Sequence, residues 1–225
     1  MSPTRHPGHG LAGNHTQGRK STNNPLRGAA FVLAAHRLDQ LSADTGAEVA
    51  FAGRSNAGKS SAINALVGHG ALARTSKTPG RTQQLVVFAL PDGHRLGDLP
   101  DYGYAKVQPA LRQHWKQEID AYLRERKSLR GLVLIADVRH ALKEYDRQML
   151  HFCADIGLSC VLLLSKADKL SRSQALAAQR KVQGEIAQIG SGGARTAPRA
   201  GTILFSATTG VGVEEARAAV MELLS

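Results

Sequence analysis

One eight-residue segment restricts the possible folds of this chain more than any other feature. Residues 53–60 read Gly53-Arg54-Ser55-Asn56-Ala57-Gly58-Lys59-Ser60. This is the spacing G-x-x-x-x-G-K-[ST], in which the glycines let successive backbone N–H groups turn toward a phosphate. The apolar run Glu48–Ala52 before it predicts a buried strand, and Lys59–Val67 after it predicts a helix. The segment therefore favours a P-loop NTPase; the alternative is a glycine-rich turn that binds nothing.

Predicted strands and helices alternate along the rest of the chain. Apolar patterning predicts strands over Ala29–Ala34, Leu85–Leu90, His94–Asp98, Leu132–Asp137, Ser159–Ser165 and Thr202–Phe205. Further helices are predicted over Pro109–Leu129, Lys143–Ile156, Ser171–Ile189 and Val213–Leu224. A hairpin is expected at Pro91-Asp92-Gly93. We therefore expect an α/β fold, a three-layer P-loop NTPase of the Ras-like type, whose mostly parallel sheet has one antiparallel strand and helices on both faces.

The length of 225 residues suits one domain with a tail. Residues 1–25 are rich in Pro, Gly, His, Asn and Ser and contain no acidic residue, which predicts a disordered basic tail before a single domain over residues 26–225. The formal net charge of +11 favours a polyanionic partner, with nucleic acid ahead of an anionic membrane. The alternative is that the charge serves solubility.

The sequence predicts a cytoplasmic protein. The longest apolar stretches, Leu132–Ala136 and Val161–Leu164, have the length of strands and are too short to span a bilayer. The N-terminal region has no apolar signal core. Cys153 and Cys160, the two cysteines, form neither a disulfide framework nor a metal-ligand spacing, so we expect two buried thiols.

A second motif indicates which base the nucleotide carries. Ser165-Lys166-Ala167-Asp168 follows the apolar strand Val161–Leu164 and has the form [NT]-K-x-D, with Ser at the first position. The Asp168 carboxylate can accept hydrogen bonds from guanine N1–H and the N2 amine, whereas adenine has neither donor there. Lys166 is expected to lie over the base, and the Ser206-Ala207 backbone to contact guanine O6. The competing class is an ATP-using P-loop kinase.

Two segments between these motifs are candidate switches. Asp98-Leu99-Pro100 ends the predicted hairpin, where an Mg²⁺-associated aspartate is expected. Ser76–Gln83 is a polar loop with Pro79 and Gly80 between the first helix and the next strand.

These motifs together resemble the EngB GTPases of the TrmE–Era–EngA–EngB–septin-like group. The segments that carry the resemblance are GRSNAGKS, ARTSKTPGRTQ, DLP-x-YGYA, DVRH and SKADKL, and it extends from about Phe31 to the C-terminus. It implies a GTP-binding protein that uses Mg²⁺ and acts in assembly of the bacterial large ribosomal subunit through the subunit precursor or its rRNA. It also implies a requirement for cell division and septation. No membrane or DNA partner is expected.

The resemblance assigns nucleotide contacts by position. They fall on Gly53, Arg54, Ser55, Asn56, Ala57, Gly58, Lys59, Ser60, Gly80, Arg81, Thr82, Gln83, Gln84, Asp98, Leu99, Pro100, Asp101, Ser165, Lys166, Ala167, Asp168, Phe205, Ser206 and Ala207. Ser60 and Thr82 are expected to bind Mg²⁺, with Lys59 and Thr82 as catalytic residues. Thr78 competes with Thr82 for the role of switch threonine.

The chain departs from the family pattern at two positions. Asp101 stands where the family has Gly, and Gly97 stands where an apolar residue is usual. A carboxylate at position 101 adds negative charge beside the phosphates. We therefore hypothesise that the chain binds GDP but switches poorly on GTP.

The resemblance also bears on hydrolysis. Tyr102 occupies the place of the water-positioning Gln of Ras-like enzymes, so slow intrinsic turnover is expected, with catalysis mainly electrostatic. Asn56 resembles an asparagine that binds K⁺ in related GTPases; alternatively, it only caps the loop.

A basic segment follows the second candidate switch. Its cations are Lys106, Arg112, Lys116, Arg124, Arg126, Lys127 and Arg130. They favour a phosphate-driven rRNA contact, or simply complement the helix dipole. Three functions stay open: a GTPase that times ribosome assembly, a nucleotide-dependent binding module with negligible hydrolysis, and a division factor that does not act through the ribosome.

Overall fold

The computed structural model describes residues 24–73, 84–101, 109–191 and 201–225. Its strands are β1 (Ala30–Ala35), β2 (Glu48–Gly53), β3 (Leu85–Ala89), β4 (Arg95–Asp98), β5 (Leu129–Asp137), β6 (Ser159–Ser165) and β7 (Gly201–Leu204). Its α-helices are α1 (Lys59–Val67), α2 (Pro109–Glu125), α3 (Glu144–Ile156), α4 (Arg172–Ser191) and α5 (Val213–Leu224). Short 3₁₀ turns occupy η1 (Leu38–Gln40), η2 (Val138–His140) and η3 (Ala167–Lys169). The proposed tail, residues 1–25, lies almost wholly outside the described residues.

The strands form one sheet in the order β1-β3-β4-β2-β5-β6-β7. Strand β3 pairs antiparallel with both β1 and β4, whereas the pairs β2–β4, β2–β5, β5–β6 and β6–β7 are parallel. The sheet is therefore mostly parallel with one antiparallel strand, as the sequence predicts. At the predicted hairpin, Gly93 has a φ of +88° and its N–H donates to Leu90 O over 3.0 Å.

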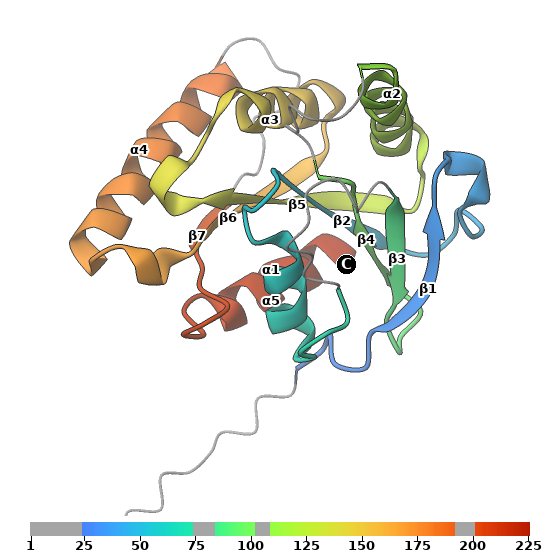
Figure 1. Ribbon diagram of the computed structural model, residues 1–225, viewed down its shortest axis with the longest axis horizontal. Helices are drawn as coiled ribbons and strands as arrows, with labels where there is room; N and C mark the ends of the chain where they lie inside the picture. Colours follow the sequence, from blue (N-terminus) through green and yellow to red (C-terminus); the bar gives the residue numbers. More distant parts are fainter. Residues whose placement is uncertain (1–23, 74–83, 102–108, 192–200) are drawn as a thin grey trace, which may run out of the picture.

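Helices cover both faces of the sheet, and each face has its own apolar core. Helices α1 and α5 lie on one side, and α2, α3 and α4 lie on the other (Figure 1). Strand β5 shows why both faces are apolar: Val133 and Ile135 pack in the α1–α5 core, whereas Leu132 and Leu134 pack in the opposite core. This alternation with a period of two, apolar on both sides, is typical of a parallel strand between two helical layers.

The boundary between α2 and β5 differs from the prediction. The helix ends at Glu125 and not at Leu129, and the strand begins at Leu129, three residues earlier than expected. The Asp44 carboxylate accepts hydrogen bonds from the N–H groups of Lys127 and Ser128, each over 2.8 Å, and Ser128 O accepts from Glu48 N–H over 2.8 Å. These long-range contacts end the helix, although the apolar pattern continues across it.

A buried ionic cluster anchors the start of β2. The fully buried Glu48 carboxylate accepts hydrogen bonds from Arg95 Nε over 3.0 Å, from Arg126 Nη2 over 3.1 Å and from the Tyr122 hydroxyl. Burial beside Glu48 raises the pKa of Tyr122, so its hydroxyl stays protonated and donates. A Cβ on Gly97 would lie 2.7 Å from this hydroxyl oxygen, which explains why this chain has glycine at that position.

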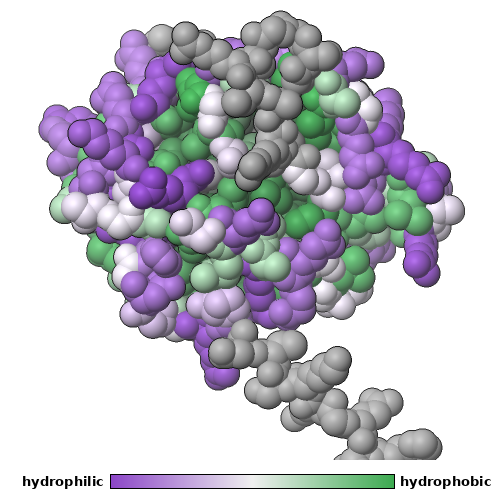
Figure 2. Space-filling view, turned by 180° about the vertical axis from the view of Figure 1, so that it is seen from behind, coloured by the Kyte–Doolittle hydropathy of each residue, from purple (hydrophilic) through white to green (hydrophobic). Residues whose placement is uncertain are grey.

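Hydrophilic and hydrophobic residues are unevenly distributed over one face of the molecule. Seen from the side opposite to Figure 1, hydrophilic residues predominate around the edge of the molecule and hydrophobic residues gather toward the middle of that face (Figure 2).

Cys153 and Cys160 are both buried and free, as expected. Among the described helices, none is long and apolar enough to cross a membrane.

Candidate nucleotide-binding site

The predicted site segments meet at one edge of the sheet. The segments that follow β2, β4, β6 and β7 all leave the carboxyl ends of parallel strands, which share an edge (Figure 1). Direct contacts join them: Lys59 pairs with Asp98, Ser165 Oγ bonds Ala57 O, and the Ala167 N–H donates to Phe205 O over 3.0 Å. Residues widely separated in the sequence therefore form one site.

The segment 53–60 adopts the conformation of a phosphate loop. Gly58 has a φ of +99° and immediately precedes α1, and the preceding turn is closed by the Ala57 N–H donating to Arg54 O over 3.0 Å. Asn56 also has a positive φ, +62°, which asparagine tolerates better than most residues. Gly53 lies close to β5, its neighbour in the sheet: a Cβ on Gly53 would lie 2.9 Å from Ile135 O. The loop thus leads directly into the N-terminus of α1, where backbone N–H groups favour an anion.

Lys59 is the central cation of this edge. Its side chain is only 3% exposed, and Nζ pairs with the Asp98 carboxylate and lies 3.1 Å from Asp101 Oδ1. Burial alone would lower the pKa of Lys59, but the two carboxylates outweigh it and raise the pKa, so the group is an ammonium ion. Burial raises the pKa of Asp98, which Lys59 opposes.

The segment 98–101 is held against the central strand. The Leu99 N–H donates to Phe51 O over 2.9 Å, which continues the β2–β4 pairing one residue beyond the strand. Leu99 and Pro100 are buried, whereas the Asp101 side chain is 25% exposed. Asp101 therefore follows directly after an anchored stretch of backbone.

Ser165 and Lys166 connect the two motifs found in the sequence. The Ser165 hydroxyl donates to Ala57 O and also lies 3.2 Å from Ala136 O. Lys166 has a φ of +59°, and its Nζ donates to Asn56 O over 2.6 Å and lies 3.0 Å from Asp137 Oδ2. Both side chains thus link the loop after β6 to the phosphate loop.

Asp137 is a site residue that the sequence reasoning missed. At the end of β5 it contacts Lys166 and also accepts from Arg139 Nη2 over 2.7 Å. Partial burial would raise its pKa, but the hydrogen bonds from Arg139 and Lys166 hold the pKa of Asp137 well below its usual range. The available signal was its place at the carboxyl end of a buried strand in the DVRH segment. His140 of that segment lies in the η2 turn.

Asp168 is held by the loop after β7. Ser206 Oγ donates to Asp168 Oδ1 over 2.7 Å, and Lys169 Nζ lies 3.2 Å from Oδ2. The Ser206 hydrogen bond lowers the pKa of Asp168, so this carboxylate is an acceptor at neutral pH. Ser206 itself is fully buried, and its N–H donates to Val211 O over 2.9 Å.

Not every predicted contact residue can be placed. Gly80, Arg81, Thr82 and Gln83, with Thr78 and Tyr102, lie outside the described residues. Gln84 is described, and its amide nitrogen lies 2.7 Å from His36 Nε2 in the segment after β1. Arg126, counted among the basic surface residues, is buried against Glu48, so it does not belong to a surface for RNA.

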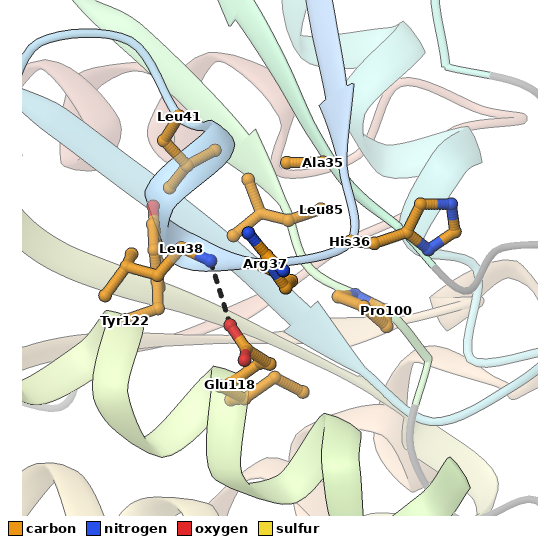
Figure 3. A pocket seen from close by; sticks show the side chains of 10 residues that line it. Ala35, His36, Arg37, Leu38, Leu41, Leu85, Pro100, Glu118 and Tyr122 are labelled. Carbon is orange, nitrogen blue, oxygen red and sulfur yellow. Dashed lines mark hydrogen bonds between the residues drawn. The ribbon is translucent and has the colours of Figure 1, made fainter.

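A small hollow lies beside the site, on the side of the antiparallel strand. Residues of the β1–η1 segment, Leu85, Pro100 and helix α2 line it, and Leu38 N–H donates to Glu118 Oε2 over 2.8 Å across it (Figure 3). Pro100 connects this hollow to the segment that carries Asp101.

The residues present fit a phosphate group and its counter-ion. The glycine conformation at the start of α1, the buried Lys59 ammonium and the half-buried Ser60 are groups that would suit phosphate oxygens. Asp98, at the end of β4, supplies a carboxylate close to the same point. A serine hydroxyl and a carboxylate beside phosphates are suitable groups for Mg²⁺.

Comparison with known proteins identifies the family. The model of a family described as "50S ribosome-binding GTPase" matches residues 48–166. The "Probable GTP-binding protein EngB" of Stenotrophomonas maltophilia is 53% identical over 192 residues, which cover 85% of this chain and 93% of that protein. The chain belongs to the EngB family. The EngB protein of Xylella fastidiosa strain 9a5c is 55% identical over 164 residues, covering 73% of this chain and 81% of that protein. The resemblance seen in the sequence motifs is thereby confirmed.

Solved structures support the fold. A crystal structure of a probable EngB GTP-binding protein matches with a TM-score of 0.62 at 21% identity, covering 79% of this chain and 98% of that one. A bacterial selenocysteine-specific elongation factor matches with a TM-score of 0.53 at 21% identity, covering 80% of this chain and 29% of that chain. These matches confirm the predicted α/β G-domain architecture of this EngB family member.

Proposed function

We propose that this EngB protein is a guanine-nucleotide-binding GTPase that uses Mg²⁺ and acts in assembly of the large ribosomal subunit. One observation carries the nucleotide part of the proposal: the phosphate loop and Asp168 lie at the same sheet edge, tied together by Ser165 and Lys166. The groups proposed to bind the phosphates and the base are thus linked by hydrogen bonds at one edge of the sheet.

The phosphate half of the site consists of backbone and one lysine. The N–H groups of residues 53–60 and the Lys59 ammonium would bind the β- and γ-phosphates. This requires Lys59 to exchange at least one carboxylate partner for phosphate oxygen. Such contacts stabilise the charge that spreads over the transferring phosphoryl group, so their contribution to hydrolysis is electrostatic.

The base half discriminates guanine from adenine. Asp168, oriented by Ser206, would accept from guanine N1–H and the N2 amine, and the Lys166 stem would cover the ring. Since the Ser206 N–H is already bonded to Val211 O, we assign the contact to guanine O6 to the Ala207 N–H. Adenine would leave the Asp168 acceptor unpaired.

The metal would be held by Ser60, together with Thr82. Mg²⁺ would neutralise negative charge on the β- and γ-phosphate oxygens during transfer. Tyr102 at the position of a water-orienting residue supports slow intrinsic turnover. A K⁺ ion at Asn56 is a further element of the proposal; equal turnover in KCl and NaCl would remove it.

The ribosomal part of the proposal is supported by family membership and by charge. The matching family is described as ribosome-binding, and the chain carries a formal net charge of +11, which favours contact with rRNA phosphates. A role in cell division would follow from failed ribosome assembly. Co-sedimentation with large-subunit precursors tests this part, and septal localisation without such binding would favour the division-specific alternative.

Calorimetric titration with GDP and ATP tests the nucleotide part. We expect binding of GDP and no measurable binding of ATP. Asp168→Ala should weaken GDP binding by about 100-fold, because the N1–H and N2 donors of guanine lose their acceptor. Asp155→Ala, which removes an exposed carboxylate from α3, is the matched control and should bind GDP like the wild type. Equal affinities for ATP and GDP would contradict the proposal.

Phosphate release separates the two remaining alternatives. A GTPase that times assembly should release phosphate faster when large-subunit precursors are added. A nucleotide-dependent binding module should associate with the precursors without such stimulation.

A further inference from the structure

Lys59, the lysine proposed to bind the β- and γ-phosphates, already pairs with two carboxylates. Its Nζ pairs with Asp98 and also with Asp101, whose Oδ1 lies 3.1 Å away. An ammonium group has three N–H donors, and the two carboxylates use two of them. The lysine side chain is 3% exposed, so this pairing takes place away from bulk solvent.

The backbone around Asp101 favours this pairing. The Leu99 N–H is bonded to Phe51 O, Leu99 is fully buried and Pro100 is buried, so the chain is fixed up to the residue before Asp101. Proline also restricts the conformation of the chain at position 100. From this anchored backbone the Asp101 carboxylate contacts Lys59, while a quarter of its side chain is exposed.

We propose that Asp101 acts as a built-in competitor of the γ-phosphate for Lys59 and makes this protein selective for the diphosphate. The inference rests on the proposed guanine-nucleotide function and names the residue that determines which nucleotide state is preferred. It requires no covalent step, because only the partner of one ammonium group changes.

The charges explain the selectivity. A diphosphate leaves the γ-position free, so Asp101 keeps its contact with Lys59 while the β-phosphate uses the third donor. A triphosphate brings further negative charge to the same ammonium. Either two anions then share one cation at close range, or the carboxylate leaves and its ion pair is lost. Both outcomes penalise the triphosphate and not the diphosphate.

The test compares the affinity for GDP with that for a GTP analogue whose β,γ-bridge cannot be hydrolysed, in Mg²⁺, for the wild type and three variants. We expect the wild type to prefer GDP. Asp101→Asn keeps the size of the side chain and removes its charge, and should shift the ratio of the two dissociation constants toward the triphosphate by about tenfold, the effect of about 1.4 kcal/mol. Asp101→Gly should shift it at least as far.

Two controls isolate the charge at this position. Asp101→Glu keeps the charge and should keep the wild-type preference for GDP. Asp155→Asn removes one negative charge from the exposed face of α3 and should leave the ratio unchanged.

The outcomes separate this inference from the proposed function. A wild type that prefers the triphosphate, or an Asp101→Asn variant with the wild-type ratio, would overturn the inference while GDP binding upholds the function. A shift in Asp101→Gly without one in Asp101→Asn would also overturn it, since backbone freedom and not charge would then be responsible. Failure of the wild type to bind GDP would remove the proposed function, and the inference with it.

Discussion

At the scale of single residues, the site depends on side chains that connect loops. Ser165 joins the segment after β6 to the phosphate loop through Ala57 O, and Lys166 does the same through Asn56 O. The serine, which stands where the base-reading motif more often has Asn or Thr, is therefore a working part of the site. Because the serine side chain is short, its hydroxyl contacts a backbone carbonyl while the residue remains buried.

Ser165→Ala tests this connection. The variant leaves Ala57 O without this buried donor, so we expect the free energy of unfolding to fall by about 1 kcal/mol. GDP binding should weaken several-fold, because the hydrogen bond that joins the two loops is lost. Chemical denaturation and calorimetric titration measure the two effects. Ser173→Ala on the exposed part of α4 should change neither, and an unaltered GDP affinity in Ser165→Ala would contradict the connecting role.

Asp44 predicts a specific pH dependence of stability. Desolvation would raise its pKa, but the N–H donors of Lys127 and Ser128 lower the pKa of Asp44 from 3.8 to about 2. Because the folded pKa is the lower one, its contribution is complete above the unfolded pKa and is lost as the pH falls from about 4 to about 2. The difference in unfolding free energy between wild type and Asp44→Ala should be constant above about pH 5 and should shrink as the pH falls below that value. A constant difference down to pH 2 would refute this.

At the scale of elements, the sequence predicted what depends on local pattern and missed what depends on distant partners. The glycine loop before α1 and the continuous apolar runs of β5 and β6 predicted the sheet and the position of Lys59. The predicted end of α2 at Leu129 was wrong, because contacts with Asp44 and Glu48, about 80 residues upstream, end the helix earlier. The role of Asp137 was missed for the same reason: its partner Lys166 is on another strand end.

The Glu48 cluster also explains a glycine that the family comparison left unexplained. Gly97 leaves room for the Tyr122 hydroxyl beside Glu48, so a larger residue at position 97 and a tyrosine at position 122 exclude each other. A Cβ at 2.7 Å from the hydroxyl oxygen is closer than normal contact.

A double-mutant cycle tests this exclusion. Gly97→Ala should lower the free energy of unfolding by about 2 kcal/mol, as expected for overpacking in a core. In the Tyr122→Phe background, which removes the hydroxyl, the same substitution should cost less by about 1 kcal/mol or more. Denaturant unfolding of the four proteins measures the coupling. Additive effects would show that the hydroxyl is not the obstacle.

At the scale of the whole molecule, the positive charge is divided between structural and solvent-facing groups. Arg126 is buried in the Glu48 cluster, and Arg124 pairs with Asp120 over 3.1 Å and lies 4.5 Å from the centre of the Phe152 ring. Lys127 and Arg130, in contrast, are exposed at the α2–β5 junction. Among the cations of this segment whose side chains the structure describes, we therefore expect Lys127 and Arg130 to contact rRNA phosphates.

Salt dependence tests that assignment. The double variant Lys127→Gln, Arg130→Gln should bind large-subunit precursors more weakly, and the slope of log affinity against log salt should fall by about 1 to 2. The matched double variant Arg180→Gln, Lys181→Gln removes two exposed cations from α4. An equal loss in both double variants would indicate a general charge effect and not a contact at this junction.

The antiparallel β3 has a geometric consequence for the molecule. Because β3 leaves the nucleotide edge and β4 returns to it, Gln84 and Asp98 stand at the same end of a two-stranded ribbon, where Val86 pairs with Asp98. Gln84 and Asp98 therefore lie side by side at one end of a ribbon whose other end is the turn at Gly93. Because β4 also pairs with β2, the strand that leads into the phosphate loop, the positions of Gln84, Asp98 and Gly53 relative to one another are set by the same sheet.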